Sequence, residues 1–191
     1  MKKLPFYDLI DSLYCHREIA EFYTYSHDSD HFAVGKIIDY SQEEVAIQAI
    51  DSCGYKDGFF IGRIKDICRI STQTSYIKSL QKLYQNNYVP KEESSVIHCQ
   101  EDNIKRNLYS TYIQRIICKH DIVTCTLYCD VSVIGFIDNV TNQLVKMRVI
   151  AQDGSYNGVT FFYVNDIETL SFDGSEENKY IKIIGNKNTC K

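Results

Sequence analysis

The sequence predicts an α+β fold, mainly β, built from two tandem copies of one small unit. Residues 35–71 align with residues 135–171 without a gap, at a spacing of 100 residues. Apolar residues alternate with a period of two in both segments, which indicates strands with one buried face. An amphipathic helical pattern precedes the strands in each copy, from Phe6 to Tyr14 and from Ile104 to Ile116.

The matching positions are those that a shared fold requires. Nine identities fall within the 37 aligned residues, and they are glycines at turns, apolar residues in strands and a few polar residues. In the first copy they are Gly35, Ile37, Val45, Ile50, Gly54, Gly58, Asp66, Ile67 and Ser71, and each recurs 100 residues later. Two unrelated β segments with coincident turns are the alternative, and the kind of residue that matches favours a true repeat.

Each copy is expected to contain about five short strands after its helix. In the first copy the strand signals run from Phe22 to Thr24, from Val45 to Ala49, from Phe59 to Arg63 and from Ile67 to Ile70. Glycine supplies the positive φ of hairpin loops, and Asp accepts hydrogen bonds from nearby backbone amides in tight turns. The predicted structural turn residues are Gly35, Gly54, Gly58, Asp66, Gly135, Gly154, Gly158 and Asp166. The two aspartates are therefore read as turn residues, and not as catalytic acids.

The predicted domains are a first unit over residues 1–73, a helical linker over residues 74–95 and a second unit over residues 96–191. A helical pattern from Ser75 to Gln85 supports the linker, and a polar stretch after Pro90 marks its end. One further strand is expected from Tyr180 to Ile184.

A helix followed by five short, bent strands resembles the Sm-like fold, a member of the SH3-like small barrels, over residues 5–71 and 104–171. The resemblance implies two closed barrels, pairing of edge strands between units and, often, binding of single-stranded RNA. Gly35 and Gly135 match the family's glycine in the second strand, and Arg63 matches its basic residue near the end of the motif. The base-reading Asp and Asn positions of the family hold Ser41 and Val45 here, and Thr141 and Val145 in the second copy.

Charge and composition favour a protein partner. The net charge is −4, and residues 1–100 carry 11 basic against 14 acidic side chains. A large surface that wraps phosphates is therefore excluded. Tyrosine is abundant, at 15 residues, and it is effective in interfaces. We expect a non-enzymatic binding or scaffold protein that binds protein partners or forms a homo-oligomer.

Binding of RNA or of another single-stranded nucleic acid is the alternative function. Arg63, Lys65 and Arg69 alternate near the last strand of the first copy, with Tyr40 or Tyr55 close to loops. Cations beside an exposed aromatic ring form a stacking platform for bases. An ordinary solvated charged surface is the competing interpretation of the same residues.

No catalytic motif or cofactor signature occurs, so neither an enzyme nor a cofactor is expected. The closest set of possible zinc ligands is Cys118, His120, Cys125 and Cys129, whose spacing matches no common zinc finger. The sequence leaves open whether they bind a metal. The loop of residues 26–31, Ser-His-Asp-Ser-Asp-His, is read as a polar surface loop.

The sequence also predicts a cytoplasmic protein without a membrane segment. Acidic residues and Pro5 interrupt the apolar run after the two N-terminal lysines, which is not the pattern of a signal peptide. No segment approaches the roughly 18–20 consecutive apolar residues that a membrane helix needs. The eight cysteines form no CxxC pair and are expected to be reduced thiols.

Overall fold

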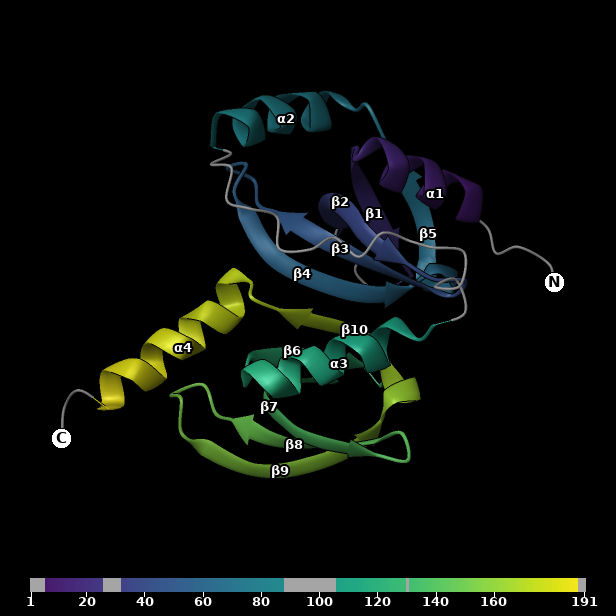
Figure 1. Ribbon diagram of the computed structural model, residues 1–191. Helices are drawn as coiled ribbons and strands as arrows, with labels where there is room; N and C mark the ends of the chain where they lie inside the picture. The colour runs from purple at the N-terminus through teal and green to yellow at the C-terminus, as the bar shows by residue number, and fades with distance from the viewer. Residues whose placement is uncertain (1–5, 26–31, 88–105, 130, 189–191) are drawn as a thin grey trace. The chain divides into compact units, whose positions relative to one another are not determined.

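The computed structural model (Figure 1) describes residues 6–25, 32–87, 106–129 and 131–188. The chain forms two compact units, unit 1 from Met1 to Leu108 and unit 2 from Tyr109 to Lys191. Among the helices of the described residues, none has the length and apolar character needed to cross a membrane.

Unit 1 is a five-stranded antiparallel sheet with two helices. Its elements are α1 (Tyr7–His16), β1 (Ile19–Thr24), β2 (Phe32–Tyr40), β3 (Glu44–Ile50), β4 (Lys56–Arg63), the 3-10 turn η1 (Ile64–Asp66), β5 (Ile67–Ser71) and α2 (Ser75–Asn87). The strand order within the unit is β5-β1-β2-β3-β4. Helix α2 includes residues Ser75 to Gln85, for which the sequence predicts a helix.

Unit 2 repeats this plan. Its elements are α3 (Leu108–Lys119), β6 (Ile122–Leu127), β7 (Val131–Thr141), β8 (Leu144–Ile150), β9 (Tyr156–Tyr163), the 3-10 turn η3 (Val164–Asp166), β10 (Ile167–Phe172) and α4 (Ser175–Asn188). The strand order within the unit is β10-β6-β7-β8-β9. The predicted α+β class, with two five-strand halves that each follow a helix, is confirmed.

The pairing registers of β2, β3 and β4 recur 100 residues later in β7, β8 and β9. The first strands are offset differently, because Ile19 pairs with Lys36 and Ile122 pairs with Phe136, a spacing of 103 residues between β1 and β6. Gly35 pairs with Ala49 in unit 1, and Gly135 pairs with Val149 in unit 2. The register also shifts at the same place, between Ile37 and Asp39 and again 100 residues later. The repeat read from the sequence is therefore a repeat of strand register.

The closed barrel implied by the Sm-like resemblance is wrong. In unit 1 the edge strands are β4 and β5, and β5 pairs with β1 on the far side of the sheet from β4. The reason is the three-residue turn η1, whose Ile64 N–H donates to the Glu43 carbonyl oxygen at 2.8 Å. This turn takes the place of a hairpin between β4 and β5, and β5 pairs with β1 instead of β4. Turn η3 does the same in unit 2, where Val164 N–H donates to the Gln143 carbonyl oxygen at 2.8 Å.

A helix replaces the strand expected from Tyr180 to Ile184. These residues lie in α4, where Tyr180 packs on the buried Ile122 and Ile150, and Ile184 packs against the same cluster. Residues four apart share one face of a helix, so the apolar spacing suits α4, although the isoleucines favour a strand by propensity. Helix α2 makes the equivalent packing in unit 1, and the repeat therefore includes a closing helix.

The core of unit 1 lies between α1 and the sheet. Helix α1 buries Ile10 and Leu13 against Phe22, Ile37 and Ile47. Helix α2 packs Ile77, Leu80 and Tyr84 on a second cluster, which contains Ile19, Val34 and Ile50. The apolar side of each amphipathic helix thus packs against residues of the sheet.

The predicted turn residues have two different roles. Gly54 and Gly154 adopt φ values of 83° and 79° in the hairpin loops. Gly58 and Gly158 also have positive φ, at 74° and 88°, but they lie within β4 and β9 and not in the turns predicted for them. Asp66 and Asp166 end the two 3-10 turns, and their carbonyl oxygens accept from the N–H groups of Tyr25 and Tyr128 at 3.1 Å.

Gly35 and Gly135 lie inside β2 and β7, and not in the turns predicted for them. A Cβ at Gly35 would lie 2.1 Å from the Gln48 carbonyl oxygen, and one at Gly135 would lie 1.9 Å from the Arg148 carbonyl oxygen. Glycine is required at these positions because the neighbouring strand approaches too closely for a side chain.

Candidate functional site

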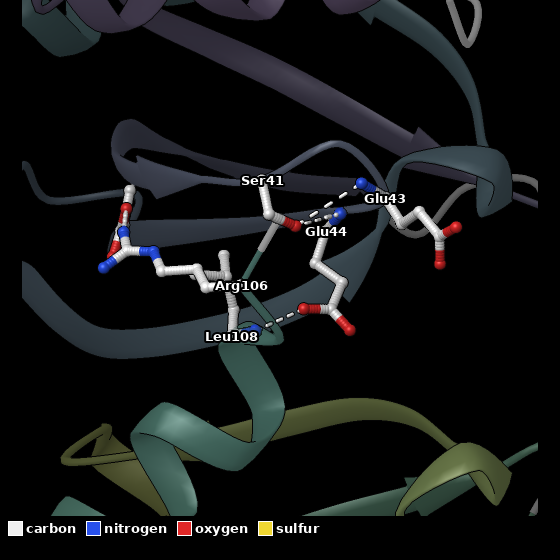
Figure 2. A network of polar contacts seen from close by, with 6 residues as sticks. Ser41, Glu43, Glu44, Arg106 and Leu108 are labelled. Carbon is white, nitrogen blue, oxygen red and sulfur yellow. Dashed lines mark hydrogen bonds and ion pairs between the residues drawn. The ribbon is translucent and has the colours of Figure 1, made fainter. Parts of the chain in front are cut away.

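Two buried carboxylates at the tip of the β2–β3 hairpin in unit 1 hold a segment from much later in the chain (Figure 2). Asp39 forms an ion pair with Arg106. Glu44 accepts hydrogen bonds from the backbone N–H of Leu108 and, at 3.1 Å, from Asn107 Nδ2. We call these five residues the carboxylate clasp.

The clasp is built by the turn between β2 and β3. Ser41 Oγ accepts hydrogen bonds from the N–H of Glu44 at 3.1 Å and of Glu43 at 3.4 Å. This Ser-turn fixes the start of β3, where Glu44 is 2% exposed. Asp39, near the end of β2, is 3% exposed. Buried carboxylates are stable only when they are paired or hydrogen-bonded, and here Arg106 to Leu108 supply the partners.

The corresponding hairpin of unit 2 has no carboxylate at either of these two positions. The repeat places Asn139 at the position of Asp39 and Leu144 at the position of Glu44. Asn139 is exposed and Leu144 is partly exposed. Asn142 and Gln143 form the turn with φ values of 51° and 66°. The two units therefore share a backbone register and differ in the chemistry of this hairpin.

Next to this hairpin, the outer side of β8 and β9 carries exposed apolar and basic side chains. The register pairs Leu144 with Tyr163, Lys146 with Phe161 and Arg148 with Val159, so these six residues point to the same side of the sheet. We call them the β8–β9 face. Val159, Phe161 and Tyr163 are 39%, 59% and 55% exposed, whereas Phe162 between them is buried.

Two cations flank the aromatic residues of the face. Arg148 Nε donates to Asp138 Oδ1 at 2.6 Å, and its guanidinium lies 5.3 Å from the centre of the Phe136 ring. Lys146 Nζ lies 3.8 Å from Asp138 Oδ2. The Asp138 carboxylate therefore interacts with both Lys146 and Arg148. Two positive charges against one negative charge leave the face with a net positive charge.

Strand β9 is an edge strand of its unit and has no charged residue, since its sequence is Tyr-Asn-Gly-Val-Thr-Phe-Phe-Tyr. The other strands at the edges of the two units each contain a charge: Arg63 in β4, Arg69 in β5 and Glu168 in β10. Charges on an edge strand discourage pairing with another chain, and β9 lacks this protection. The face and its edge are therefore suited to contact another polypeptide.

The structure separates the four residues predicted to bind nucleic acid. Tyr55 precedes β4 and Arg63 ends it. The eight residues of β4, Lys56–Arg63, span roughly 23 Å at the usual rise of a strand, so Tyr55 and Arg63 lie at opposite ends of it. Arg63 is half-buried and pairs in register with Glu44 of the clasp. Lys65 and Arg69 are exposed, in η1 and β5.

Arg69 belongs to an aromatic stack that the sequence analysis missed. Its guanidinium lies 3.6 Å from the centre of the Tyr23 ring, and Tyr23 stacks on Phe32 with ring centres 5.0 Å apart. Phe32 meets Tyr76 of α2 edge to face at 6.1 Å. Burial and the hydrogen bond to the Glu21 carboxylate raise the pKa of Tyr23 above its usual value. No sequence signal links these residues, because four separate elements, β1, β2, β5 and α2, bring them together.

The possible zinc ligands do not form a cluster. Cys118 lies in α3 and His120 follows it, Cys125 is buried in β6, and Cys129 is exposed beyond that strand. In the part of the chain that the structure describes, no group of at least three His, Cys, Asp or Glu side chains is placed to hold a metal ion. The loop of residues 26–31, with His27 and His31, lies outside the described residues.

Comparison with known proteins gives no relative: no protein-family model, no curated protein and no solved structure matches the chain. The functional argument therefore depends on the chain's own residues. The alternation of Val159, Phe161 and Tyr163 is visible in the sequence, but alternation alone does not tell whether that side of the strand is covered.

Proposed function

We propose that this protein is a non-enzymatic binding or scaffold protein that joins polypeptide chains, a second copy of itself included, through the β8–β9 face. The observation that carries the proposal is the exposure of Val159, Phe161 and Tyr163, at 39%, 59% and 55%, on one side of an uncharged edge strand. The experiment below uses the second copy as the partner, because it needs only this chain.

The energetics favour covering this face. An aromatic side chain buries roughly 150–250 Å² when it is fully enclosed, and removal of apolar surface from water contributes about 25 cal/mol per Å². Phe161 lies in the central cross-strand pair of the face, opposite Lys146, and has Tyr163 and Val159 on either side of it along β9. Aromatic anchors surrounded by polar groups are typical of the energetic centre of a protein interface.

A strand edge adds a second source of binding energy. Among the described residues of unit 2, no strand pairs with the backbone N–H and C=O groups on the outer side of β9. An extended segment can pair with such an edge and gain backbone hydrogen bonds, while the side chains of the face set specificity.

Charge favours a protein over a nucleic acid at this face. Asp138 offsets part of the charge of Lys146 and Arg148, and the chain as a whole has a net charge of −4. Nucleic-acid binding draws most of its affinity from many phosphate contacts with Lys and Arg.

RNA binding is the second candidate, and it concerns a different surface. The stack of Arg69, Tyr23 and Phe32 combines a cation with aromatic rings, with Lys65 exposed in the adjacent turn. This combination is the one on which single-stranded nucleic acids stack.

The test is the molar mass of the chain in solution, measured by light scattering and by sedimentation from about 1 to 100 µM, the range of modest protein affinities. We expect the wild-type chain to form an oligomer and Phe161→Glu to be monomeric, because the substitution places a charge at the centre of the face. Tyr55→Glu is the matched control, since Tyr55 is 56% exposed on unit 1, and it is expected to behave as wild type.

Two results would overturn the proposal: a monomer throughout the concentration range, or an oligomer that Phe161→Glu leaves unchanged. Circular dichroism and thermal melting establish that the variants fold. Binding of pooled RNA is measured in parallel over a salt series. Steeply salt-dependent binding that Arg69→Glu abolishes, with a monomeric protein, would favour the RNA function.

A further inference from the structure

The part of the edge strand β9 that can pair regularly with another chain is a segment of five residues. The pairing of β9 with β8 is continuous from Val159 to Tyr163, and the register shifts before Val159. Gly158 at that end has a φ of 88°, a conformation that interrupts a regular strand. At the other end, Tyr163 is followed directly by the turn η3. A segment bounded on both sides has one midpoint, and that midpoint is Phe161.

This segment is complementary to a second copy of itself. Antiparallel strands place side chains of the same sheet face opposite each other, so full overlap of two copies puts Phe161 opposite Phe161. Val159 of each copy then lies opposite Tyr163 of the other, and Thr160 lies opposite Phe162. Each pair is aromatic with aromatic or aromatic with β-branched, and such cross-strand pairs stabilise antiparallel sheets.

The two edge strands of unit 1 lack this complementarity. The segment Phe59–Arg63 of β4 pairs with β3 in the same register as the β9 segment pairs with β8. Its overlap with a second copy would place Gly62, which has no side chain, opposite Phe60. Strand β5 has Arg69 at its midpoint, so overlap would place two arginines opposite each other, which is destabilising. Self-complementarity thus distinguishes β9 from β4 and β5.

The cations of the β8–β9 face favour pairing of two edges over stacking of two faces. Lys146 lies opposite Phe161 within unit 2. In an edge contact, three strand spacings therefore separate Lys146 from Lys146 of the second copy, which is roughly 14 Å. That separation exceeds the screening length of about 8 Å at physiological salt. Two stacked faces would instead bring Lys146 and Arg148 of both copies into one interface, and juxtaposed like charges weaken binding.

From these observations, and resting on the self-association proposed above, we infer that β9 of one copy pairs with β9 of a second copy, antiparallel, in a two-fold contact centred on Phe161. The contact joins the sheets of the two copies at their β9 edges. It gathers Val159, Phe161 and Tyr163 of both copies into one apolar cluster, which removes part of their surface from water. Both copies use the same surface, so the contact closes at a dimer.

Disulfide cross-linking tests this register. Opposite residues of antiparallel strands have Cα atoms about 4.5–5.5 Å apart, which is within the range of a disulfide. Phe161→Cys should therefore cross-link two copies. Val159→Cys and Tyr163→Cys each leave their own two cysteines roughly 14 Å apart, so neither should cross-link alone. An equimolar mixture of these two variants should cross-link, because the two positions lie opposite each other.

The cross-linking variants are made in a full-length chain in which every native cysteine except the buried Cys125 is replaced by serine. Cross-linked dimer is measured on non-reducing gels after mild oxidation, and peptide mass spectrometry identifies the linked residues. Tyr55→Cys, at a position that is 56% exposed on unit 1, is the control for random collisions and should not cross-link. Circular dichroism establishes that the serine background and its variants fold.

A second measurement keeps the native cysteines. Phe161→Glu and Phe161→Lys each place two like charges opposite each other in the two-fold contact, so each should weaken self-association by about tenfold or more. Their equimolar mixture places a carboxylate opposite an ammonium group and should associate more tightly than either variant alone. Sedimentation with a fluorescent label on one variant counts the mixed species. The mass of the wild-type chain should stop rising at that of a dimer.

The outcomes separate this inference from the proposed function. Cross-linking of Phe161→Cys and of the mixture, but not of Val159→Cys alone, supports the two-fold contact. If Phe161→Glu abolishes association while the cross-links follow another pattern, the face binds a second copy in a different way, and the inference is wrong although the proposed function stands. Association beyond a dimer, or a mixture of charge variants no tighter than either alone, would also contradict it. A wild-type chain that stays monomeric would overturn both proposals.

Discussion

The carboxylate of Glu44 accepts a hydrogen bond from the backbone N–H of Leu108, a residue 64 positions further along the chain. Leu108 is the first residue of α3, and an N–H at the start of a helix has no partner within the helix. Glu44 satisfies that donor while Asn107 occupies the other carboxylate oxygen. One buried acidic side chain thus satisfies its own hydrogen-bonding needs and those of a helix start.

Replacement of Glu44 tests the strength of this contact. In Glu44→Gln one acceptor oxygen becomes a donor that faces the Leu108 N–H or the Asn107 amide group. We expect the free energy of unfolding to fall by about 1–3 kcal/mol, the usual cost of leaving a buried polar group unsatisfied. Urea denaturation measures the effect. Glu43→Gln is the matched control because Glu43 is exposed, and equal losses for the two variants would contradict the assigned role of Glu44.

The ion pair of Asp39 and Arg106 is tested by a double-mutant cycle. The Asp39 side chain is 4% exposed and that of Arg106 is 15% exposed, so loss of either partner leaves a largely desolvated charge. We expect Asp39→Asn and Arg106→Gln each to destabilise the chain, and the double variant to be less destabilised than the sum. A coupling free energy of about 0.5–3 kcal/mol is expected. Additive effects would show that the two side chains do not interact in solution.

Glycine at position 35 is predicted to be required by close packing of β2 against β3. In Gly35→Ala the new Cβ would meet the Gln48 carbonyl oxygen at 2.1 Å, which forces the strands apart and is expected to cost about 1–3 kcal/mol. Gly62→Ala is the control within the same sheet, since no atom lies within 4 Å of a Cβ at Gly62. Thermal melting compares the two variants, and a Gly35→Ala variant as stable as wild type would refute the close approach.

Cys125 is predicted to be unreactive in the folded protein. Complete burial raises the pKa of its thiol to about 12, and the thiolate is the reactive form. At about pH 8 iodoacetamide should therefore modify the exposed Cys15, Cys53, Cys68, Cys118 and Cys129, but should leave Cys125 intact until the chain is unfolded in denaturant. Peptide mass spectrometry identifies the modified sites, and rapid labelling of Cys125 in the native protein would contradict its burial.

The same pKa shift gives the direction of a pH effect. Because the folded-state pKa of Cys125 is raised from 9.0 to about 12, its contribution to stability is complete below pH 9.0 and is lost as the pH rises towards about 12. We expect the unfolding free energy of wild type to fall more steeply over this interval than that of Cys125→Ala. Parallel slopes in the two proteins would show that the thiol does not titrate with folding.

Much of the fold was predictable because the signals are local. The alternation of Val45, Ile47 and Ala49 predicts a strand, and the pair Gly54 and Gly154 indicates equivalent turns. Both signals depend only on residues that are close in sequence. The helix starting near Tyr7 follows from the spacing of Ile10 and Leu13. For the candidate site, the sequence indicated a non-enzymatic binding protein rich in tyrosine, but it pointed to Arg63 and Tyr55, which lie at opposite ends of β4.

The sequence by itself determined the repeat, its strand register and the helix before each set of strands, because periodicity and turn glycines act over a few residues. Only the tertiary structure decided that the sheets stay open, since pairing of β5 with β1 depends on residues far apart in sequence. It also decided that Tyr180 and Ile184 belong to a helix, through their packing near Ile122 and Ile150. The tertiary structure also decided that Phe161 is exposed and Glu44 is buried. Burial of a strand residue depends on which other parts of the folded chain pack against that side of the strand.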